Sequence, residues 1–416
     1  MSARVALAAL LADPAVSRAL AALDGDGEET RIVGGSVRNA LFGLPQTDID
    51  MATTATPDIV MTRARRAGLK AIPTGFEHGT VTVVVAGRPF EVTTLREDVE
   101  TDGRRAKVRF GRDFEADARR RDFTINSMSL TRDGVLHDPL GGQEDLAARR
   151  VRFIGDAHQR IAEDYLRVLR FFRFHAAYGE GPLDRIGLEA AIWGRNGLTK
   201  LSAERVRAEI LKLLAAKRGP HVAEEAAQAG LLDFAFAGVA SPSRLARLAE
   251  VEAARGQAAD ALLRLGAFAV LVREDGDRLR DRLRLSNAEH RRLHGAACAL
   301  EALHGREAPP EAPALAECVF RHGADATGDA LALAHAESRA PADDPNWHEA
   351  YKAAQEMRDL KLPVSGEDLK QRGVTEGRAI GAVLKTLQAN WIRAGFPRDP
   401  AEVARLIDEA IGAKRN

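Results

Sequence analysis

Residues 31–50 read RIVGGSVRNALFGLPQTDID, in which a short β-branched run enters a glycine-rich turn and then a helical stretch. Gly34 and Gly35 allow backbone N–H groups to approach a phosphate closely, and the N-terminus of the helix adds positive potential. Arg38 supplies a guanidinium that can donate two parallel hydrogen bonds. A Gly-Gly pair alone is more often a tight turn, so the predicted phosphate site depends on the residues that follow.

The sequence Asp48-Ile49-Asp50 begins ten residues after Arg38 and carries two carboxylates, one on each side of Ile49. Residues 48–51 are predicted to form a strand, in which side chains two apart project from the same face. Paired carboxylates repel each other unless a cation lies between them, and Mg²⁺ prefers one or two carboxylates together with phosphate oxygens. Asp48 and Asp50 are therefore the predicted metal ligands, with Mg²⁺ as the expected ion.

The glycine turn, Arg38 and the Asp48-Ile49-Asp50 motif together resemble the signature of class II template-independent nucleotidyltransferases of the polymerase β superfamily. This family includes the CCA-adding tRNA nucleotidyltransferases and the bacterial poly(A) polymerases. The resemblance implies an α+β fold, in which a small N-terminal catalytic domain with a mixed sheet precedes a mostly helical neck, body and tail. One departure is Asn39, where the family usually has aspartate, and we expect only a minor effect on local helix capping.

Two further segments match the same family in order. The sequence FEVTTL at 90–95 resembles the strand that supplies a third active-site carboxylate, which makes Glu91 a candidate general base or metal-associated residue. A lone glutamate on a hairpin strand is the alternative. Residues 96–118 carry many charges of both signs without periodicity, a composition typical of a mobile loop over a site. In the family, this place holds a flexible loop found in enzymes that add all three nucleotides.

The sequence RRRDFTIN at 119–126 resembles the family motif that contacts the sugar and phosphates of the nucleotide. Arg121 can offer a planar fork to a phosphate. Asp122 can accept a hydrogen bond from a ribose hydroxyl, which would favour ribonucleotides over deoxyribonucleotides. Adjacent arginines are more often a solvated basic run, but the Asp-Phe-Thr that follows favours the binding motif.

A helix is predicted over residues 156–178, with Asp164 and Arg167 as neighbours on one face and Arg170 and Arg173 continuing the row. A surface ion pair is the simpler interpretation. However, the EDxxR pattern resembles the family motif that reads the base in place of a template. A carboxylate can accept from the amino group of cytosine or adenine while a guanidinium donates to the ring nitrogen. The resemblance assigns the two later arginines to the triphosphate or the tRNA end.

The chain has 416 residues with 60 basic and 60 acidic side chains, so any site for a polyanion must be local. Its two cysteines, Cys298 and Cys318, are too few for a disulfide framework or a four-cysteine zinc site and are predicted to be ordinary apolar side chains. A faint signal-peptide pattern is outweighed by an amphipathic first helix, because Asp13 and Pro14 end the apolar run. We expect a cytoplasmic location, no membrane association and no obligate protein partner.

Strand patterns are confined to the first part of the chain, and helical periodicity covers the rest. The predicted strands lie at 31–33, 48–51, 81–86 and 90–95. The predicted helices beyond residue 155 lie at 156–178, 202–217, 222–236, 243–255, 259–273 and 286–304. We expect four domains: a catalytic head (1–150), a neck that recognises the base (151–217), an RNA-binding body (218–305) and a tRNA-binding tail (306–416).

The C-terminal half carries less specific features. Six arginines between residues 278 and 292 indicate either a solvated face or a surface that contacts tRNA phosphates. Proline-rich segments at 308–313 and 341–345 are predicted to be linkers or loops. Glycines recur at 366, 373, 377 and 381, and we expect them to permit close packing of helices.

The resemblance places the chain in the CCA-adding branch of the family, with tRNA, CTP and ATP as substrates. The tRNA 3′-hydroxyl would attack the α-phosphorus at Asp48, Asp50 and Glu91 and release pyrophosphate. The predicted nucleotide-binding residues are Gly34, Gly35, Arg38, Arg121, Asp122, Asp164, Arg167, Arg170 and Arg173. A poly(A) polymerase or a CC-only enzyme is the alternative within the family, and a non-catalytic RNA-binding protein is the alternative outside it.

Overall fold

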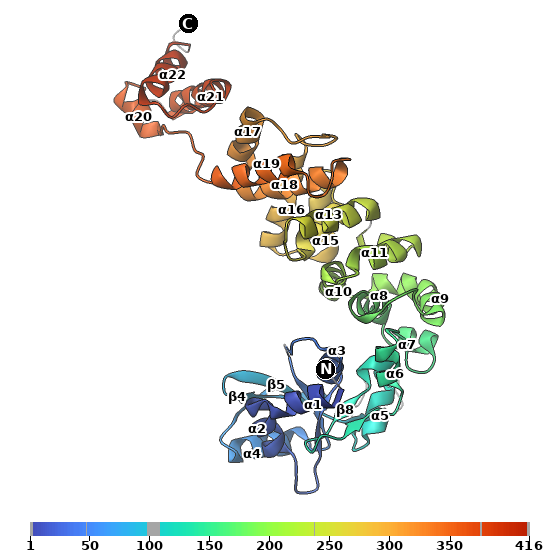
Figure 1. Ribbon diagram of the computed structural model, residues 1–416. Coiled ribbons are helices and arrows are strands. Elements are labelled where there is room, and N and C mark those ends of the chain that lie inside the picture. Colours follow the sequence, from blue (N-terminus) through green and yellow to red (C-terminus); the bar gives the residue numbers. More distant parts are fainter. Residues whose placement is uncertain (1–2, 47, 98–108, 237, 375–376, 414–416) are drawn as a thin grey trace. The chain divides into compact units, whose positions relative to one another are not determined.

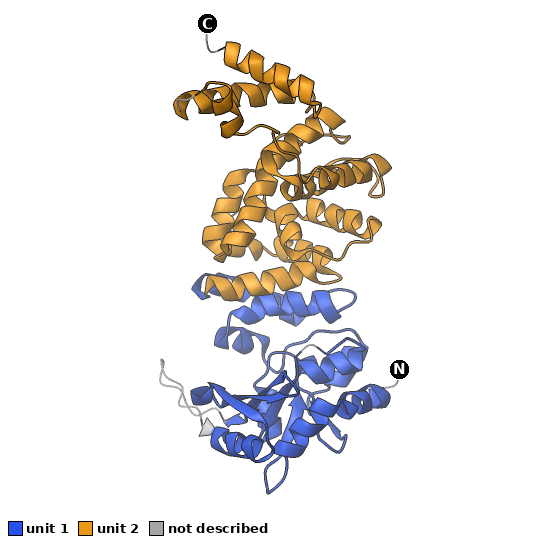
Figure 2. Ribbon diagram, turned by 90° about the vertical axis from the view of Figure 1, so that its left-hand side faces the viewer, with its two compact units in different colours: residues 1–201 blue, residues 202–416 orange. Residues whose placement is uncertain are grey.

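The computed structural model describes residues 3–46, 48–97, 109–236, 238–374 and 377–413. The chain divides into two compact units, residues 1–201 and residues 202–416, coloured blue and orange in Figure 2. Every strand among the described residues lies in the first unit, and the second unit is helical. The predicted α+β fold is therefore confirmed.

The first unit is built on a mixed sheet with the strand order β3-β4-β5-β2-β1-β8-β9 (Figure 1). Strands β2 and β5 pair in parallel, and the other neighbours are antiparallel. The strands are β1 (Thr30–Val33), β2 (Asp50–Thr53), β3 (Lys70–Gly75), β4 (Thr80–Val85), β5 (Arg88–Thr94), β8 (Ser129–Leu130) and β9 (Leu136–His137). A separate two-stranded pair joins β6 (Arg96–Glu97) to β7 (Arg109–Phe110).

Four helices of the first unit accompany this sheet: α1 (Ala3–Ala12), α2 (Pro14–Leu23), α3 (Gly35–Phe42) and α4 (Pro57–Arg66). Alternate residues of β4, Val81, Val83 and Val85, are buried, and both α2 and α4 contact this strand. Apolar alternation with period two gives the sheet one buried face. The alternate side chains of each strand point to the opposite face, and that opposite face is available for polar groups.

The expected first helix forms as two helices. Asp13 breaks the run and caps α2, because its Oδ1 accepts hydrogen bonds from the N–H groups of Ala15 (2.9 Å) and Val16 (3.1 Å). Among the described helices none is by itself long and apolar enough to cross a membrane; α1 and α2 meet that length and composition only as a pair bent by 75°.

The rest of the first unit comprises short helices after the sheet: α5 (Phe114–Arg119), η2 (Thr124–Asn126), α6 (Gly142–Ala147), α7 (Ala157–Glu163), α8 (Leu166–Tyr178), α9 (Arg185–Gly194) and η3 (Arg195–Lys200). Of the segment 96–118 predicted to be a loop, residues 98–108 lie outside the described residues. Its flanks are ordered as β6, β7 and α5, and Asp113 caps α5.

The helix predicted over 156–178 is broken at Asp164 and Tyr165. Asp164 has an extended backbone (φ −153°, ψ 106°), and its Oδ1 accepts a hydrogen bond from the N–H of Leu166 at 3.1 Å. The carboxylate therefore satisfies one of the donors that a new helix leaves open, and two helices replace the single one expected.

Aromatic packing crosses the predicted boundary between residues 150 and 151. The ring of Phe123 lies 4.8 Å from that of Phe153 and 5.2 Å from that of Phe174 between centroids, and all three side chains are buried. Because these rings share one core, the first part of the predicted neck belongs to the same compact unit as the head. The structure places its division at residues 201 and 202 instead.

The second unit consists of thirteen described helices: α10 (Ala203–Ala215), α11 (Gly219–Gln228), α12 (Leu232–Phe236), α13 (Pro242–Ala254), α14 (Ala261–Ala269), α15 (Arg273–Leu283), α16 (Asn287–Leu300), α17 (Ala312–His322), α18 (Ala324–Glu337), α19 (Pro345–Glu356), α20 (Gly366–Gln371), α21 (Gly377–Arg393) and α22 (Pro400–Gly412). One apolar cluster runs from Leu248 to Ala354, and another from Val364 to Ala410. The predicted boundary at 305 and 306 falls inside the first cluster. The proline-rich segments lead into α17 and α19 as loops between packed helices.

Most of the predicted arginine surface is engaged by neighbouring groups. Arg292 pairs with Asp329 (2.7 Å) and Asp260 (2.7 Å), and these hydrogen-bonded carboxylates raise the pKa of its guanidinium. Arg278 donates to the carbonyl of Ala269 at the end of α14 (3.0 Å), and Arg282 donates to the carbonyl of Phe234 on α12 (2.6 Å). These arginines hold helices together, and a tRNA-contacting surface in this unit stays a prediction.

Of the glycines expected to pack closely, Gly366 does so, since a Cβ there would lie 3.3 Å from Cγ2 of Ile380. A tighter approach occurs at a glycine that the sequence did not indicate. A Cβ on Gly197 would lie 1.9 Å from the ring of Tyr165, so only glycine fits beside the helix break. Gly377 and Gly381 of α21, by contrast, would meet no described atom within 4 Å. The expectation of close packing at those two glycines is wrong, since they lie on an exposed face.

These two kinds of glycine predict stability changes of opposite sign. We expect Gly197→Ala to lower the free energy of unfolding by about 1–3 kcal/mol through overpacking against Tyr165. Gly381→Ala, its control in an open helical position, should raise it by up to about 1 kcal/mol through helix propensity. Thermal and chemical denaturation of the two variants measure this. Equal effects of the two substitutions would contradict the packing described for Gly197.

Candidate active site

Two of the predicted carboxylates lie side by side across the parallel strands β2 and β5. Asp50 is the register partner of Glu91, and Met51 is the partner of Val92. Met51 and Val92 are buried in the core, whereas Asp50 and Glu91 are exposed. Alternation along the strands therefore directs both carboxylates to the face opposite the core. The structure brings Glu91 to the acidic motif, and its catalytic role stays a prediction.

Asp48 lies in the loop before β2, which begins only at Asp50, and not in a strand as predicted. The hydroxyl of Ser36 holds this loop: its Oγ donates to the carbonyl oxygen of Asp48 (3.2 Å) and accepts from the N–H of Asp50 (3.2 Å). Ser36 is buried in the first turn of α3. One hydroxyl thus joins the glycine turn to the acidic motif.

The carboxylates are close enough to influence one another. Asp50 reaches solvent, yet the protein atoms around it desolvate it in part and raise its pKa above the ordinary value; the negative charges of Glu91 and Asp48 raise the pKa further, while Arg121 opposes them. A divalent cation would relieve this repulsion, and carboxylate oxygens suit a hard ion. Asp48 and Asp50 therefore fit the predicted metal site on their donor chemistry, and Glu91 lies beside it.

A cleft of about 340 Å³ opens at these carboxylates, and three arginines share its lining with Asp50 and Glu91. Burial lowers the pKa of the Arg96 guanidinium, and the positive charge of Arg120 lowers it further. The Nε atoms of Arg96 and Arg120 are shielded from water and have no hydrogen-bond partner among the described residues. The cleft thus presents carboxylates to a cation and guanidinium groups with unused donors to an anion.

The third arginine of the cleft, Arg121, lies against the glycine turn. Its Nη2 donates to Asp117 Oδ2 at 3.2 Å, and a Cβ on Gly34 would come within 2.6 Å of its Nη1. Gly34 also has φ +61°, a conformation that favours glycine. Its N–H donates to the carbonyl of Met128 at 3.0 Å, so this group is not open to a phosphate as predicted. Gly34 instead makes room for the guanidinium.

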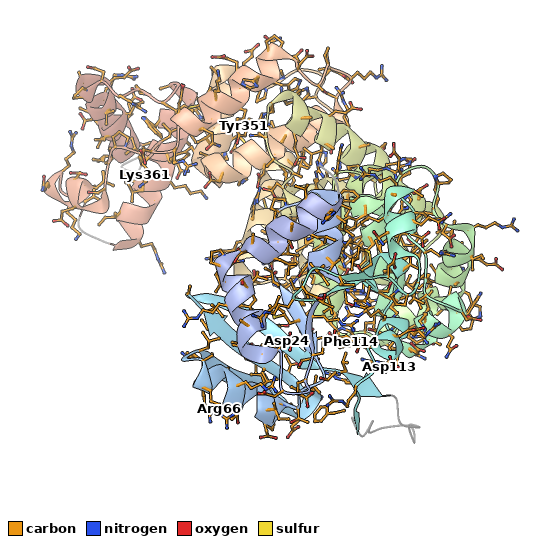
Figure 3. All side chains as sticks on the ribbon, turned by 60° about the horizontal axis from the view of Figure 1, so that its bottom comes forward. Asp24, Arg66, Asp113, Phe114, Tyr351 and Lys361 are labelled. Atoms are coloured by element: carbon orange, nitrogen blue, oxygen red, sulfur yellow. The ribbon has the colours of Figure 1, made fainter. Side chains whose placement is uncertain are left out.

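The strand ends beneath the cleft are supported by a small apolar cluster. Val33, Ala52 and Leu95 are buried together, and Phe114, labelled in Figure 3, packs against them. The guanidinium of Arg31 lies over the Phe114 ring, 3.9 Å from its centroid. Helix α5, which carries the aromatic ring, is thereby fixed against the strands that present the carboxylates.

Arg38 is buried in a network instead of lying open to the cleft. Its Nη2 donates to Asn39 Oδ1 at 2.9 Å, its Nη1 donates to Asn126, and its guanidinium lies 4.1 Å from the Tyr178 ring centroid. Burial lowers its pKa. Asn39 Oδ1 also accepts from the Tyr178 hydroxyl at 2.9 Å. Asn39 therefore links α3 to α8, a larger role than the minor capping effect expected. Gly35 lies beside this network, with Arg38 Nη2 3.5 Å from the place of a Cβ.

Asp122 and Arg170 form a second link between the head and α8. Asp122 Oδ2 accepts from Arg170 Nε (2.7 Å) and Nη2 (2.5 Å), and its Oδ1 accepts from the Phe123 N–H (2.9 Å) and Asn126 Nδ2 (2.9 Å). Burial tends to raise the pKa of Asp122, but Arg170 and these hydrogen bonds outweigh it and hold the pKa low. With four bonds made, the carboxylate holds Arg170 in place. A ribose contact by Asp122 stays a prediction.

The predicted base-reading residues lie at the helix break. Arg167 Nη1 donates to Glu163 Oε2 (2.6 Å), and its Nη2 donates to the carbonyl of Arg120 (3.2 Å). Asp164 follows the end of α7 and accepts from the N–H of Leu166, the first residue of α8, so Asp164 and Arg167 are close in the chain without sharing one continuous helix. The Arg173 guanidinium stacks 4.0 Å from the Phe174 ring centroid. The structure thus brings Asp164 and Arg167 together at the start of α8, where the N–H of Arg167 donates to the carbonyl of Asp164 at 3.0 Å, while Arg173 lies further along the helix.

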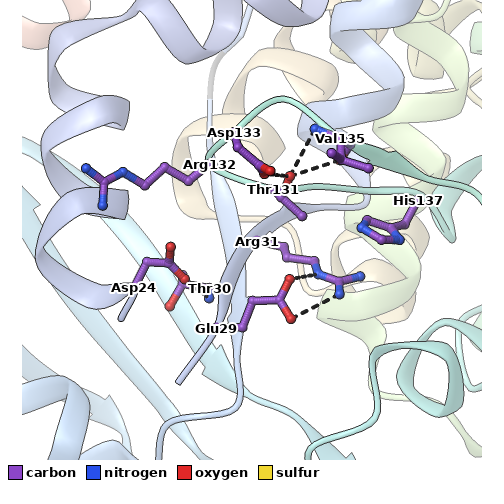
Figure 4. A pocket seen from close by; sticks show the side chains of 9 residues that line it. All are labelled: Asp24, Glu29, Thr30, Arg31, Thr131, Arg132, Asp133, Val135 and His137. Carbon is purple, nitrogen blue, oxygen red and sulfur yellow. Dashed lines mark hydrogen bonds and ion pairs between the residues drawn. The ribbon is translucent and has the colours of Figure 1, made fainter. Parts of the chain in front are cut away.

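A larger cavity of about 620 Å³ lies elsewhere in the first unit, formed by the end of α2, β1 and the β8–β9 hairpin (Figure 4). Arg31 in this cavity is paired with Glu29 (2.6 Å), and Thr131 bonds Asp133 and the carbonyl of Val135. None of the predicted site residues lines it. The smaller carboxylate cleft is therefore the candidate active site.

Comparison with known proteins identifies the family. Two family models match: the poly(A) polymerase head domain over residues 30–152, and the probable RNA and SrmB-binding site of polymerase A over residues 195–241. The chain is 35% identical to the human CCA tRNA nucleotidyltransferase 1, mitochondrial, over 390 residues, which cover 92% of this chain and 87% of the relative. It belongs to the CCA tRNA nucleotidyltransferase family.

Other members of the CCA tRNA nucleotidyltransferase family agree along nearly the whole chain. The CCA-adding enzyme of Limosilactobacillus fermentum is 31% identical over 408 residues, which cover 95% of this chain and 96% of that enzyme. The crystal structure of the Bacillus stearothermophilus CCA-adding enzyme in complex with CTP matches with a TM-score of 0.74 at 26% identity, covering 97% of this chain and 100% of that chain. The chain is thus a nucleotidyltransferase of a generally metal-dependent family.

Within this member of the CCA tRNA nucleotidyltransferase family, several contributors to the cleft were not singled out from the sequence. Arg96 and Asp117 line the cleft, and Asp117 also holds Arg121. Ser36 and Asn126 support it: Ser36 joins the glycine turn to the acidic motif, and Asn126 bonds Asp122. Asn126 was quoted as part of a motif, but its contacts to Arg38 and Asp122 depend on the tertiary fold. Hydroxyl and amide side chains carry no periodic signal of their own.

The carboxylate cluster predicts that activity and stability respond differently to Asp50→Asn. We expect nucleotide incorporation to fall by about 10³-fold or more, since a charged group at the reacting centre is removed. The metal-free variant should be at least as stable at neutral pH, because Asp50 no longer has to ionise beside Glu91. Incorporation assays and thermal denaturation without divalent ions measure the two effects. A variant that keeps activity, or one that unfolds more easily, would contradict the arrangement described.

Proposed function

We propose that the chain adds C, C and A to the 3′ end of tRNA from CTP and ATP, without a nucleic-acid template, and releases pyrophosphate. The observation that carries this proposal is the strand register that sets Asp50 beside Glu91 in a cleft shared with arginines. Carboxylates for a metal and cationic donors for phosphates are the two requirements of nucleotidyl transfer.

Asp48 and Asp50 would hold Mg²⁺, which supplies charge neutralisation at the reacting phosphate and lowers the pKa of the attacking hydroxyl. The residues of the chain then divide the remaining work. Ser36 keeps the Asp48–Asp50 loop in place through its two hydrogen bonds. Glu91, exposed on the same face as Asp50, would accept the proton of the tRNA 3′-hydroxyl as this oxygen attacks the α-phosphorus.

The leaving pyrophosphate and the triphosphate fit the guanidinium side of the cleft. Arg96, Arg120 and Arg121 line it, and the first two have an unused, buried Nε–H among the described residues. Asp117 lies between Arg120 and Arg121 and pairs with both, which fixes them before the nucleotide arrives. Preorganised donors of this kind stabilise developing charge without reorganisation at the moment of reaction.

Selection of the base would fall to Asp164 and Arg167 at the start of α8. A carboxylate accepts from the amino group that cytosine and adenine share, and a guanidinium donates to the neighbouring ring nitrogen. Uracil and guanine present the reverse order of donor and acceptor. Arg167 is already held at Glu163 and at the carbonyl of Arg120, so its fork lies next to the arginine side of the cleft.

Solved structures of relatives support the same set of substrates. One is the CCA-adding enzyme of Bacillus stearothermophilus in complex with CTP, and another is a CCA-adding enzyme complex with ATP. The Thermotoga maritima CCA-adding enzyme complexed with tRNA shares the fold of this chain at a TM-score of 0.69 and 21% identity. CTP, ATP and tRNA are therefore the substrates to test.

The product decides between the alternatives. Purified full-length protein is incubated with tRNAs ending at the discriminator base, at C and at CC, and with each of the four nucleoside triphosphates singly and together. Sequencing of the 3′ ends should show CCA restored from each start. Long adenosine tails would indicate a poly(A) polymerase, arrest at CC would indicate a CC-only enzyme, and no incorporation would indicate a non-catalytic RNA-binding protein. Each of these results would overturn the proposal.

Base selection is tested at Asp164. We expect Asp164→Ala to reduce discrimination of CTP and ATP against UTP and GTP by roughly 10- to 100-fold, the range of one charged hydrogen bond. Asp164→Asn retains an oxygen that can cap α8, so it should separate loss of selectivity from loss of the helix start. Glu189→Ala, an exposed acidic residue on α9, is the matched control. Unchanged selectivity in both Asp164 variants would remove this residue from the role.

A further inference from the structure

A cluster of metal-binding side chains lies in the second unit, outside the catalytic cleft. Helix α15 contributes Asp277, and helix α16 contributes His290 and His294. One ligand atom from each of these three residues lies within 4.8 Å of the others. The two histidines are four residues apart and therefore lie on the same face of α16. His290 Nε2 is 2.8 Å from Asp277 Oδ1.

The two helices are brought together so that this face is shared. They are joined by a short turn in which Arg284 has φ +51°, and they pack against each other. Gly276, next to Asp277, is buried, and a Cβ there would lie 3.4 Å from the Cα of His294. The small residue lets the α15 backbone approach His294 closely. The cluster is thus fixed by backbone packing as well as by side chains.

One nitrogen of the cluster lacks a partner. His294 Nδ1 is shielded from water and makes no hydrogen bond to any described residue. Buried polar atoms in folded proteins are nearly always paired, so an orphaned ring nitrogen beside a second histidine and a carboxylate requires a reason. A bound metal ion supplies one, because it is coordinated by the neutral imidazole and orients both rings.

The groups around the cluster leave its three side chains available to an ion. Arg280 lies 3.7 Å from Asp277, but it also donates to Asp281 at 3.1 Å, so it is not committed to the cluster. Cys298 lies one turn beyond His294 on α16, but it does not belong to the group of ligand atoms that lie within 4.8 Å of one another. Two imidazoles and one carboxylate are a donor set for zinc.

We propose that Asp277, His290 and His294 bind a transition-metal ion of the zinc class, with solvent in the remaining coordination position. The ion fastens α15 to α16 within the second unit. The site differs in chemistry from the carboxylates of the cleft, since nitrogen donors favour zinc and its neighbours in the transition series over Mg²⁺. It therefore does not depend on the proposed nucleotidyl transfer.

The test uses untagged full-length protein in an Asp48→Asn, Asp50→Asn background, which removes the predicted metal ligands of the cleft. Co²⁺ titration followed by visible absorption reports four-coordinate nitrogen and oxygen ligation, and equilibrium dialysis with Zn²⁺ gives affinity and stoichiometry. We expect one ion per chain, a visible tetrahedral Co²⁺ spectrum that Zn²⁺ abolishes, and a Zn²⁺-dependent rise in melting temperature.

His290→Ala, His294→Ala and Asp277→Ala should each weaken Zn²⁺ binding by at least about 10- to 100-fold and abolish the Co²⁺ spectrum. His348→Ala, an exposed histidine of the same unit, should leave both unchanged. Circular dichroism shows whether each variant is folded, and the conservative His294→Gln provides a second variant of the orphaned position. Binding that is equal in the cluster variants and the control, or no binding in the folded parent, would overturn the proposal.

Discussion

The parallel pairing of β2 with β5 is the constraint on which the cleft depends. It sets the register of Asp50 against Glu91 and sends both carboxylates away from the apolar core. Partial burial and, after it, the negative charge of Glu91 raise the pKa of Asp50, so the two carboxylates oppose each other's ionisation. The fold keeps them together because Met51 and Val92, one residue further along, are buried in the same core. Core packing thus maintains an arrangement that electrostatics alone would separate.

The arginines of the first unit are organised around this acidic centre in two groups. Arg96, Arg120 and Arg121 line the cleft with donors that remain open or are shared with one carboxylate, Asp117. Others are fully engaged: Arg38 is enclosed by amides and aromatic rings, and Arg170 is paired with a buried carboxylate. The arginines of the first group can rearrange to bind a ligand, while those of the second group hold together the helices and strands around the cleft. A sequence motif alone does not distinguish the two.

The motifs around Gly34, Asp50, Glu91 and the EDxxR pattern could be read from the sequence because their spacing is local and repeats a family order. The helix break at Asp164 could not, since the apolar periodicity continues across it and only the cap to Leu166 marks the interruption. The buried state of Arg38 depends on Tyr178, far away in the chain, and the domain limits depend on rings shared by Phe123 and Phe153. The cluster of Asp277, His290 and His294 likewise spans α15 and α16, and no local sequence pattern predicts that these two helices pack together.

Helix α8 is tied to the head at both ends and at its middle, through Arg167 to the Arg120 carbonyl, Arg170 to Asp122, and Tyr178 to Asn39. Three attachments along one helix restrict its movement relative to the strands. Under the proposed base-reading role, shifting one of its residues to fit a wrong base would disturb the other two attachments. The accuracy of nucleotide addition without a template would then depend on how firmly α8 is held in position. Substitutions that weaken its three attachments to the head would cause errors as readily as substitutions of the residues that contact the base.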